Sequence, residues 1–317
     1  MMRIASRGST LALWQAEHVR ARLRALRHDV DVEIQVVHTT GDRITDVPLA
    51  KIGDRGLFTK EVDTAVLEGR CDLAVHSLKD VPTALPAGLT LAAVMEREDP
   101  RDAFLPRPGG GPRLTDLPAG ARVGTSSLRR RALLLAARGD LVVDDLRGNL
   151  DTRLEKLHDG RYDGIILALA GLRRFGREEV AGELLDLPHW LPAVGQGALA
   201  LVTREDDTAA LEAVRPLNHS DSRAATAAER AFLAALEGGC QIPIAALGTV
   251  RGTQLMLRGL VASLDGRTVV RGEAEGAAGD ARAVGDTLAR RLLDEGAGDV
   301  LSAIRSDVGP TPEPAAP

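Results

Sequence analysis

Cysteine and aromatic residues are scarce in this chain, and each shortage excludes a class of protein. Two cysteines in 317 residues do not form the disulfide framework of a small secreted domain. Aromatic residues make up 2% of the chain, which leaves few rings on which single-stranded nucleic acid could stack. The net charge of −5 also disfavours nucleic acid as the main partner. The remaining composition, 44% hydrophobic and 27% charged, is typical of a globular protein.

Several targeting and binding signals are absent as well. No apolar run reaches the roughly 18 residues of a membrane span, so no membrane partner is expected. The N-terminal segment lacks the apolar core of an export signal, which favours a cytoplasmic location. The seven histidines show no metal-ligand spacing, so no metal is expected. Neither a Walker loop nor a GxGxxG after a first strand is present, so phosphate and dinucleotide lack their usual cradle.

Lysine is the third scarce residue, because it occurs only at positions 51, 60, 79 and 156. The other 36 of the 40 basic residues are arginine. Genomic composition alone can produce such a bias, so the abundance of arginine proves nothing. The argument for function therefore depends on where the basic residues stand.

Alternating strand-like and helix-like segments predict two α/β lobes that face a cleft, followed by a small α+β domain. Strands at 32–37 and 72–77 flank a helix at 57–67, which indicates a largely parallel sheet with helices on both faces. A Pro- and Gly-rich loop at 106–112 interrupts the alternation, which then restarts. Beyond Asn218, a helix precedes an antiparallel sheet with a hairpin signal at Asp265-Gly266.

These segments divide the chain into three domains and a tail. We expect a discontinuous first lobe of residues 1–98 and 197–217, a second lobe of residues 99–196, a third domain of residues 218–305 and a disordered tail of residues 306–317. The late strand at 198–203 would return the chain to the first lobe.

One candidate site lies where a strand runs into polar residues. In DLAVHSLKDVP (residues 72–82) an apolar strand leads directly to Lys79 and Asp80. The carboxyl end of a parallel strand is where α/β proteins bind ligands, so both side chains are candidates for a binding site. A surface ion pair at the strand end is an equally good interpretation.

A second strand end combines hydroxyl and guanidinium groups in VGTSSLRRR, at the start of a helix. The candidates are Thr125, Ser126, Ser127, Arg129 and Arg130. Free N–H groups at a helix N-terminus and the forked donors of arginine both suit a carboxylate or a phosphate. The alternative is an N-capped helix with solvated arginines.

The same pattern recurs at other junctions between strands and helices. It is found in LRGNLDTRL, in AGLRR and near the N-terminus, at Arg7, Ser9, Arg147, Gly148, Arg153 and Arg174. Because such junctions converge on one cleft, the implied ligand carries several negative groups. Without a phosphate loop, a polycarboxylate is the better candidate.

The two cysteines stand in different surroundings. Cys240 lies in EGGCQIP, a glycine-rich turn after a helix, where a thiol is exposed enough to react. The alternative is an incidental loop thiol. Cys71 opens an apolar strand and is expected to be a small buried residue.

Eight segments together resemble the hydroxymethylbilane synthase (porphobilinogen deaminase) family over essentially the whole chain. Their order and separation match the family: IASRGSTLALWQAEHV, TTGDRITDVPLAKIGDRGLFTKEV, DLAVHSLKDVPT, VGTSSLRRR, LRGNLDTRL, LALAGLRR, LPAVGQGALA and LEGGCQIPIAALG. Gly8, Thr10 and the Asp54-Arg55 pair depart from the usual residues. None of these departures affects a proposed catalytic group, although the last pair could alter the loop that contains it.

The resemblance implies an enzyme that joins four porphobilinogens on a covalent dipyrromethane and releases hydroxymethylbilane by hydrolysis. It implies that Asp80 is the catalytic carboxylate and that Cys240 holds the dipyrromethane through a thioether. Further cofactor contacts are implied for Lys79, Ser9, Thr125, Ser126, Ser127, Arg129, Arg130, Arg147 and Gly148. Substrate contacts are implied for Arg7, Arg153, Arg174 and Phe58.

The family also implies a mobile loop over the cleft and a monomeric chain. Asp46, Lys51 and Phe58 would lie on or beside this loop, and Gly53 and Gly56 would let it bend. Two other functions compete with this interpretation. Two periplasmic-binding-protein-like α/β lobes also describe an anion receptor or sensor without catalysis, and a transferase acting on phosphorylated substrates is a third candidate.

Overall fold

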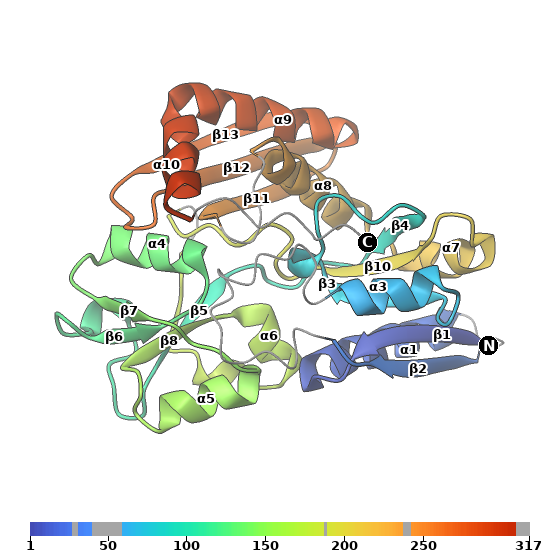
Figure 1. Cartoon of the computed structure of the whole chain (residues 1–317), viewed down its shortest axis with the longest axis horizontal. Helices are drawn as coiled ribbons and strands as arrows, with labels where there is room; N and C mark the ends of the chain where they lie inside the picture. The colour runs from blue at the N-terminus through green and yellow to red at the C-terminus, as the bar shows by residue number, and fades with distance from the viewer. Residues whose placement is uncertain (27–30, 40–58, 187–188, 237–241, 309–317) are drawn as a thin grey trace.

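Three compact bodies make up the molecule (Figure 1). The computed structural model describes residues 1–26, 31–39, 59–186, 189–236 and 242–308. In these ranges the chain forms two five-stranded α/β sheets and a third domain with a three-stranded antiparallel sheet. The expected fold class, two α/β lobes and an α+β domain, is therefore confirmed. Within the same ranges, no helix is long and apolar enough to cross a membrane.

The first lobe is a sheet with the strand order β2-β1-β3-β10-β4. Its strands are β1 (Met2–Arg7), β2 (Val32–Val37), β3 (Leu73–Ser77), β4 (Leu89–Val94) and β10 (Leu199–Arg204). Its helices are α1 (Thr10–Leu26), α3 (Lys60–Leu67) and α7 (Thr208–Val214). Apolar residues of β1, β3 and β10, among them Ile4, Leu73 and Leu201, are completely buried in the core of this lobe.

The second lobe repeats this arrangement with the strand order β7-β6-β8-β5-β9. Its strands are β5 (Asp102–Pro106), β6 (Arg122–Gly124), β7 (Val142–Asp144), β8 (Gly164–Ala168) and β9 (Glu183–Leu184). Its helices are α4 (Leu128–Ala137), α5 (Leu150–His158) and α6 (Leu169–Arg174). Helix α6 lies at the edge that faces α1 of the first lobe (Figure 1).

One strand in each sheet runs against the other four, so each sheet is largely parallel, as expected, with one reversed strand that the sequence did not indicate. Strand β10 pairs antiparallel with β3 and β4, and β5 pairs antiparallel with β8 and β9. Both reversed strands occupy the fourth place of their sheets. They are also the first strands that the chain enters after each crossing between the lobes. The alternation of strands and helices does not encode this reversal.

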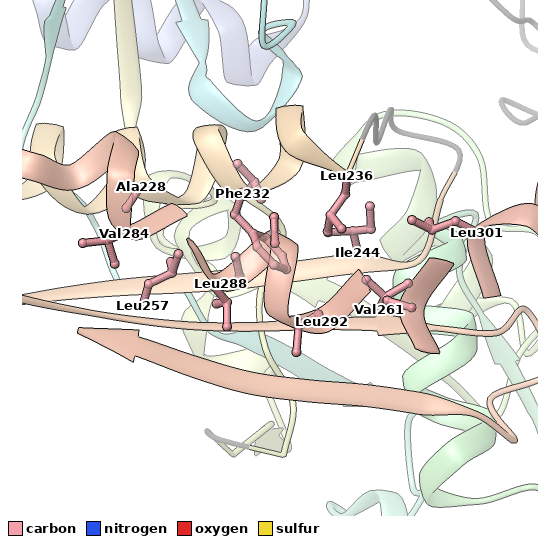
Figure 2. Packing of buried hydrophobic residues seen from close by; sticks show 14 of the residues in the cluster. Ala228, Phe232, Leu236, Ile244, Leu257, Val261, Val284, Leu288, Leu292 and Leu301 are labelled. Atoms are coloured by element: carbon pink, nitrogen blue, oxygen red, sulfur yellow. The ribbon is translucent and has the colours of Figure 1, made fainter. Parts of the chain in front are cut away.

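The third domain packs helices against an antiparallel sheet. Its strands are β11 (Ile244–Arg251), β12 (Gln254–Ala262) and β13 (Val269–Ala277), and its helices are α8 (Ser220–Ala235), α9 (Ala281–Leu292) and α10 (Gly298–Val308). Phe232 of α8, Leu257 of β12 and Leu288 of α9 meet in its core (Figure 2). Residues 306–308, expected in the tail, instead end α10.

A buried carboxylate links the third domain to the segments that join the two lobes. Glu229 of α8 is completely buried, and it pairs with the guanidinium of Arg97. Its carboxylate also accepts the backbone N–H groups of Gly195 at 2.7 Å and Gly248 at 2.8 Å. These partners satisfy a charge that would otherwise be costly to bury, and they fix where the third domain sits.

Candidate functional site

Lys79 and Asp80 follow directly on β3, in the one-turn helix Leu78–Asp80. Burial of Leu78 holds this turn against the lobe. The Nζ atom of Lys79 lies 3.4 Å from the Oε1 atom of Gln196. Burial lowers the pKa of Lys79 to about 8; Asp80 opposes this shift and Arg130 adds to it. Asp80 of the first lobe and Arg130 of the second therefore both act on one ammonium group.

The hydroxyl residues of VGTSSLRRR organise the junction between β6 and α4. Ser127 is the N-cap of α4, and its side chain accepts the backbone N–H of Arg130. Ser126 donates its hydroxyl to the carbonyl of Leu146 at 2.8 Å. Thr125 accepts the N–H of Ser127 at 3.2 Å. The N-cap interpretation is confirmed for Ser127. This observation does not test the expected contact of Ser127 with a cofactor.

Arg129 and Arg130 are not solvated, because both are buried against Asp102 of β5. Their exposed fractions are 5% and 6%, and that of Asp102 is zero. Arg129 Nη2 lies 2.8 Å from Asp102 Oδ2, and Arg130 Nη2 lies 2.7 Å from Asp102 Oδ1. Burial alone would raise the pKa of Asp102, but the two guanidinium groups hold it far below its usual range. Asp102 is thus ionised.

Asp102 is a residue that the sequence interpretation missed. It also accepts the indole N–H of Trp190 at 2.8 Å and the side-chain amide of Gln196 at 2.8 Å. The motif that contains Gln196 was noted, but no role was given to this glutamine. The only signal for Asp102 was an acidic residue just before the apolar stretch AFL, in a region without a predicted strand.

Arg153 brings a further cation toward Asp80. Its Nε donates to the carbonyl of Gly148 at 2.8 Å. Burial lowers the pKa of Arg153 to about 10, repulsion from Arg130 and Arg147 adds to the shift, and Asp80 opposes it. Gly148 has φ = +111°, and a Cβ there would lie 2.7 Å from Thr152. This backbone position therefore requires glycine.

Arg174 lies at the boundary between the two lobes. Its Nη2 donates to the carbonyl of Gly197 at 2.7 Å, and burial lowers its pKa to about 10 against the opposing effect of Glu98. On the first lobe, Arg7 ends β1, and the Ser9 hydroxyl accepts the N–H of Ala12 at 3.3 Å as α1 begins.

Some predicted residues lie outside the part of the chain that the structure describes. They are Cys240, Phe58, Asp46, Lys51, Gly53 and Gly56. Cys71 is buried as predicted, with its Sγ 3.2 Å from Oε1 of Gln35.

The charge balance of this site fits a ligand with several carboxylates. Lys79, Arg153 and Arg174 are all desolvated cations whose pKa values are lowered by burial. The buried Nε of Arg129 has no hydrogen-bond partner among the described residues. Partly buried cations with reduced pKa values gain stability when an anion arrives, because the anion favours their charged forms. A compound such as dipyrromethane, whose rings each carry carboxylates, has the required chemistry.

Comparisons with known proteins agree with this chemistry. Residues 2–212 match the family model "Porphobilinogen deaminase, dipyromethane cofactor binding domain", and residues 224–294 match "Porphobilinogen deaminase, C-terminal domain". A porphobilinogen deaminase of Trichlorobacter lovleyi is 51% identical over 300 residues, which cover 95% of either chain. One from Chromobacterium violaceum is 52% identical over 305 residues, covering 96% of this chain and 98% of the relative.

Solved structures add a weaker likeness. A periplasmic binding protein of Salmonella typhimurium with high arginine specificity overlaps 68% of this chain and 90% of its own length, at 12% identity and a TM-score of 0.38. An overlap at this level carries no conclusion about ligand or activity. The family models and the relatives cover nearly the whole chain, and they show that it belongs to the porphobilinogen deaminase family.

Proposed function

We propose that this chain performs porphobilinogen deaminase chemistry with Asp80 as its catalytic carboxylate, surrounded by cations from both lobes. The observation that carries the proposal is the position of Asp80, which acts electrostatically on Lys79 beside it and on Arg153 of the other lobe. A carboxylate beside desolvated cations suits a reaction in which a transient positive charge must be stabilised while several carboxylates are held.

Asp80 would act on the positive charge that appears when porphobilinogen loses ammonia. The departure of the amine leaves a cationic methylene-pyrrole, and a nearby carboxylate stabilises that cation and accepts a hydrogen bond from the pyrrole N–H. The same carboxylate can then take up the proton lost from the ring carbon that forms the new bond. Bound dipyrromethane supplies the first pyrrole carbon that is joined, and it brings carboxylates of its own.

The arginines and Lys79 would bind the acetate and propionate groups of the pyrroles. Within the described ranges, Arg153 and Arg174 each donate one guanidinium nitrogen to a backbone carbonyl at 2.7–2.8 Å, which leaves their other nitrogens for carboxylates. Arg7 and Arg147 are assigned the same role by the family resemblance. Arg129 and Arg130 differ, because Asp102 already engages both; their contact with the cofactor rests on the family resemblance.

The remaining assignments come from the resemblance. Cys240 would hold the dipyrromethane through a thioether, Phe58 would contact the substrate, and Ser9, Thr125, Ser126, Ser127 and Gly148 would line the site. The monomeric state and the cytoplasmic location stay predictions.

The intact mass of the purified full-length protein tests this function. We expect a covalent increment equal to two pyrrole units, which the Cys240→Ser variant lacks. Porphobilinogen should then lose ammonia only when it is incubated with the modified protein. An unmodified protein that is fully active would refute the cofactor assignment. An unmodified protein that binds porphobilinogen without turnover would support the receptor function instead.

A further inference from the structure

We propose that Gln196 is a positioning residue whose side-chain amide, oriented by Asp102, holds the ammonium group of Lys79 beside Asp80. This proposal rests on the proposed function, because Lys79 belongs to the site described there. It adds a side chain that acts through Lys79.

The neighbours of Gln196 determine which way its amide points. The Nε2 atom donates to the carbonyl of Pro100 at 2.7 Å and to Oδ1 of Asp102 at 2.8 Å. A carbonyl and an ionised carboxylate can only accept hydrogen bonds, so the amide nitrogen has to face them. The amide oxygen is left to face Lys79, whose ammonium group can only donate. The orientation of Gln196 is therefore fixed by hydrogen-bond chemistry.

The backbone of Gln196 is held just as tightly. Gly195 has φ = +72°, and a Cβ there would lie 2.9 Å from Cγ of Leu78, the residue before Lys79. Gly197 has φ = +92°, and a Cβ there would lie 2.3 Å from the carbonyl oxygen of Glu98. The backbone oxygen of Gln196 accepts the Nε of Arg97 at 2.8 Å. The two glycines thus let this segment, which is itself one crossing between the lobes, pack closely against Leu78 and against the other crossing at Glu98.

These contacts form a relay from the second lobe to the first. Asp102 stands on β5 of the second lobe, and Lys79 follows β3 of the first. Gln196 is 1% exposed and lies between them. The Lys79 contact, at 3.4 Å, is long for a hydrogen bond, so its effect is to orient and partly stabilise the charge of a flexible side chain. Without the amide, burial would lower the pKa of Lys79 further, because one group that stabilises the ammonium charge would be missing.

The scarcity of lysine makes this effect measurable at a single atom. Protein labelled with ¹³Cε-lysine should give four lysine signals, one for each lysine of the chain. We expect the Gln196→Met variant to titrate Lys79 at a pH about one unit lower than the wild type, since a hydrogen bond to the charged form is lost. The titration reads the ammonium group directly and does not depend on turnover.

Gln15→Met is the matched control. Gln15 is also buried, but its Nε2 donates to the hydroxyl of Ser77 at 2.8 Å instead of facing Lys79. This variant loses a buried amide and should leave the Lys79 titration where the wild type has it. If Gln196→Met does not fold, Gln196→Asn withdraws the amide by one methylene and should lower the Lys79 pKa in the same direction.

A folded Gln196→Met or Gln196→Asn variant with the wild-type Lys79 pKa would overturn the proposal. An equal shift in Gln15→Met would also overturn it, because any loss of a buried amide would then suffice. Intact mass separates this failure from that of the proposed function. Wild-type protein without the two-pyrrole increment would contradict the function, whereas the Lys79 titration would still report on Gln196.

Discussion

The guanidinium carbon of Arg174 lies 6.0 Å from the centre of the Trp14 indole ring. Trp14 belongs to α1 of the first lobe and Arg174 to α6 of the second, so the contact joins the lobes. The indole also stacks on His18, with ring centres 5.1 Å apart. A cation over an aromatic face gains about 0.5–2 kcal/mol, the larger value when the cation is desolvated as Arg174 is.

Replacing Trp14 should therefore weaken substrate binding through Arg174. We expect Trp14→Leu to raise KM for porphobilinogen by about 2- to 30-fold, the range that corresponds to this free energy, with a smaller effect on kcat. Trp14→Phe keeps an aromatic face and should retain part of the affinity. Steady-state kinetics measure both parameters, and an unchanged KM in Trp14→Leu would mean that the contact does not position Arg174.

Asp80→Asn should remove turnover and leave the fold intact. The amide keeps the shape of the side chain but can neither stabilise a cation as a carboxylate does nor accept a proton. A fall of about 10²- to 10⁴-fold in kcat is expected. Asp72→Asn is the control, since this first-lobe carboxylate pairs with Arg3 at 2.8 Å. Circular dichroism should show both variants folded, and near-normal turnover in Asp80→Asn would remove Asp80 from its role.

Arg130 and Arg153 should respond differently to replacement by leucine. Arg130→Leu deprives the buried Asp102 of a guanidinium partner, a change that typically lowers stability by about 3–5 kcal/mol. Among the described residues, Arg153 donates to a backbone carbonyl, that of Gly148, and pairs with no buried carboxylate, so Arg153→Leu should retain the wild-type denaturation midpoint. Both variants should impair chain growth. Equal denaturation midpoints for the two variants would contradict the structural role of Arg130.

The lowered pKa of Lys79 predicts a specific dependence of stability on pH. The folded protein releases the Lys79 proton near pH 8, whereas the unfolded chain keeps it to the ordinary value of 10.5. Because the unfolded state binds more protons in this window, stability rises with pH there. In the Cys240→Ser background, the Tm of the protein relative to Lys79→Met should therefore rise between pH 8 and pH 10 and stay level below pH 7. A constant Tm difference across that range would contradict the lowered pKa.

A pair of glycine variants separates backbone strain from close packing. Gly195 and Gly109 have similar positive φ angles, +72° and +75°. A Cβ at Gly195 would meet Leu78, whereas a Cβ at Gly109 would meet nothing within 4 Å. Gly109→Ala should lower the free energy of unfolding by about 1 kcal/mol, the cost of a positive φ angle alone. Gly195→Ala should lower it clearly more and should also displace Lys79. Thermal unfolding measures both, and equal losses would show that Leu78 yields easily.

The sequence allowed many elements and the basic character of the site to be predicted. Periodicity and capping residues are local signals, so the helix that begins after Ser127 and the strand Val32–Val37 were found where the structure has them. The polar groups after β3 and β6 were also identified, because the ends of strands are readable from composition.

Asp102 could not be assigned from sequence, because its partners come together only in the folded chain. Trp190 and Gln196 lie far along the chain from it, and a short strand such as β5 has too few residues to show a clear alternation. The reversed direction of β5 and β10 depends on tertiary packing, and side-chain periodicity carries no information about strand direction. Helices α7 and α10 were also overlooked; α7 has only seven residues, whereas α10 has 11.

The reversed strands β5 and β10 also limit how the two lobes can move. Each follows a crossing between the lobes, and two hydrogen bonds join these crossings. The N–H of Glu98 donates to the carbonyl of Gly197 at 3.2 Å, and the side-chain amide of Gln196 donates to the carbonyl of Pro100. Pulling the sheets straight apart would break these bonds. A rotation of the lobes about the two paired crossings would keep these hydrogen bonds. Any widening between the lobes should therefore be a rotation whose pivot lies beside Lys79.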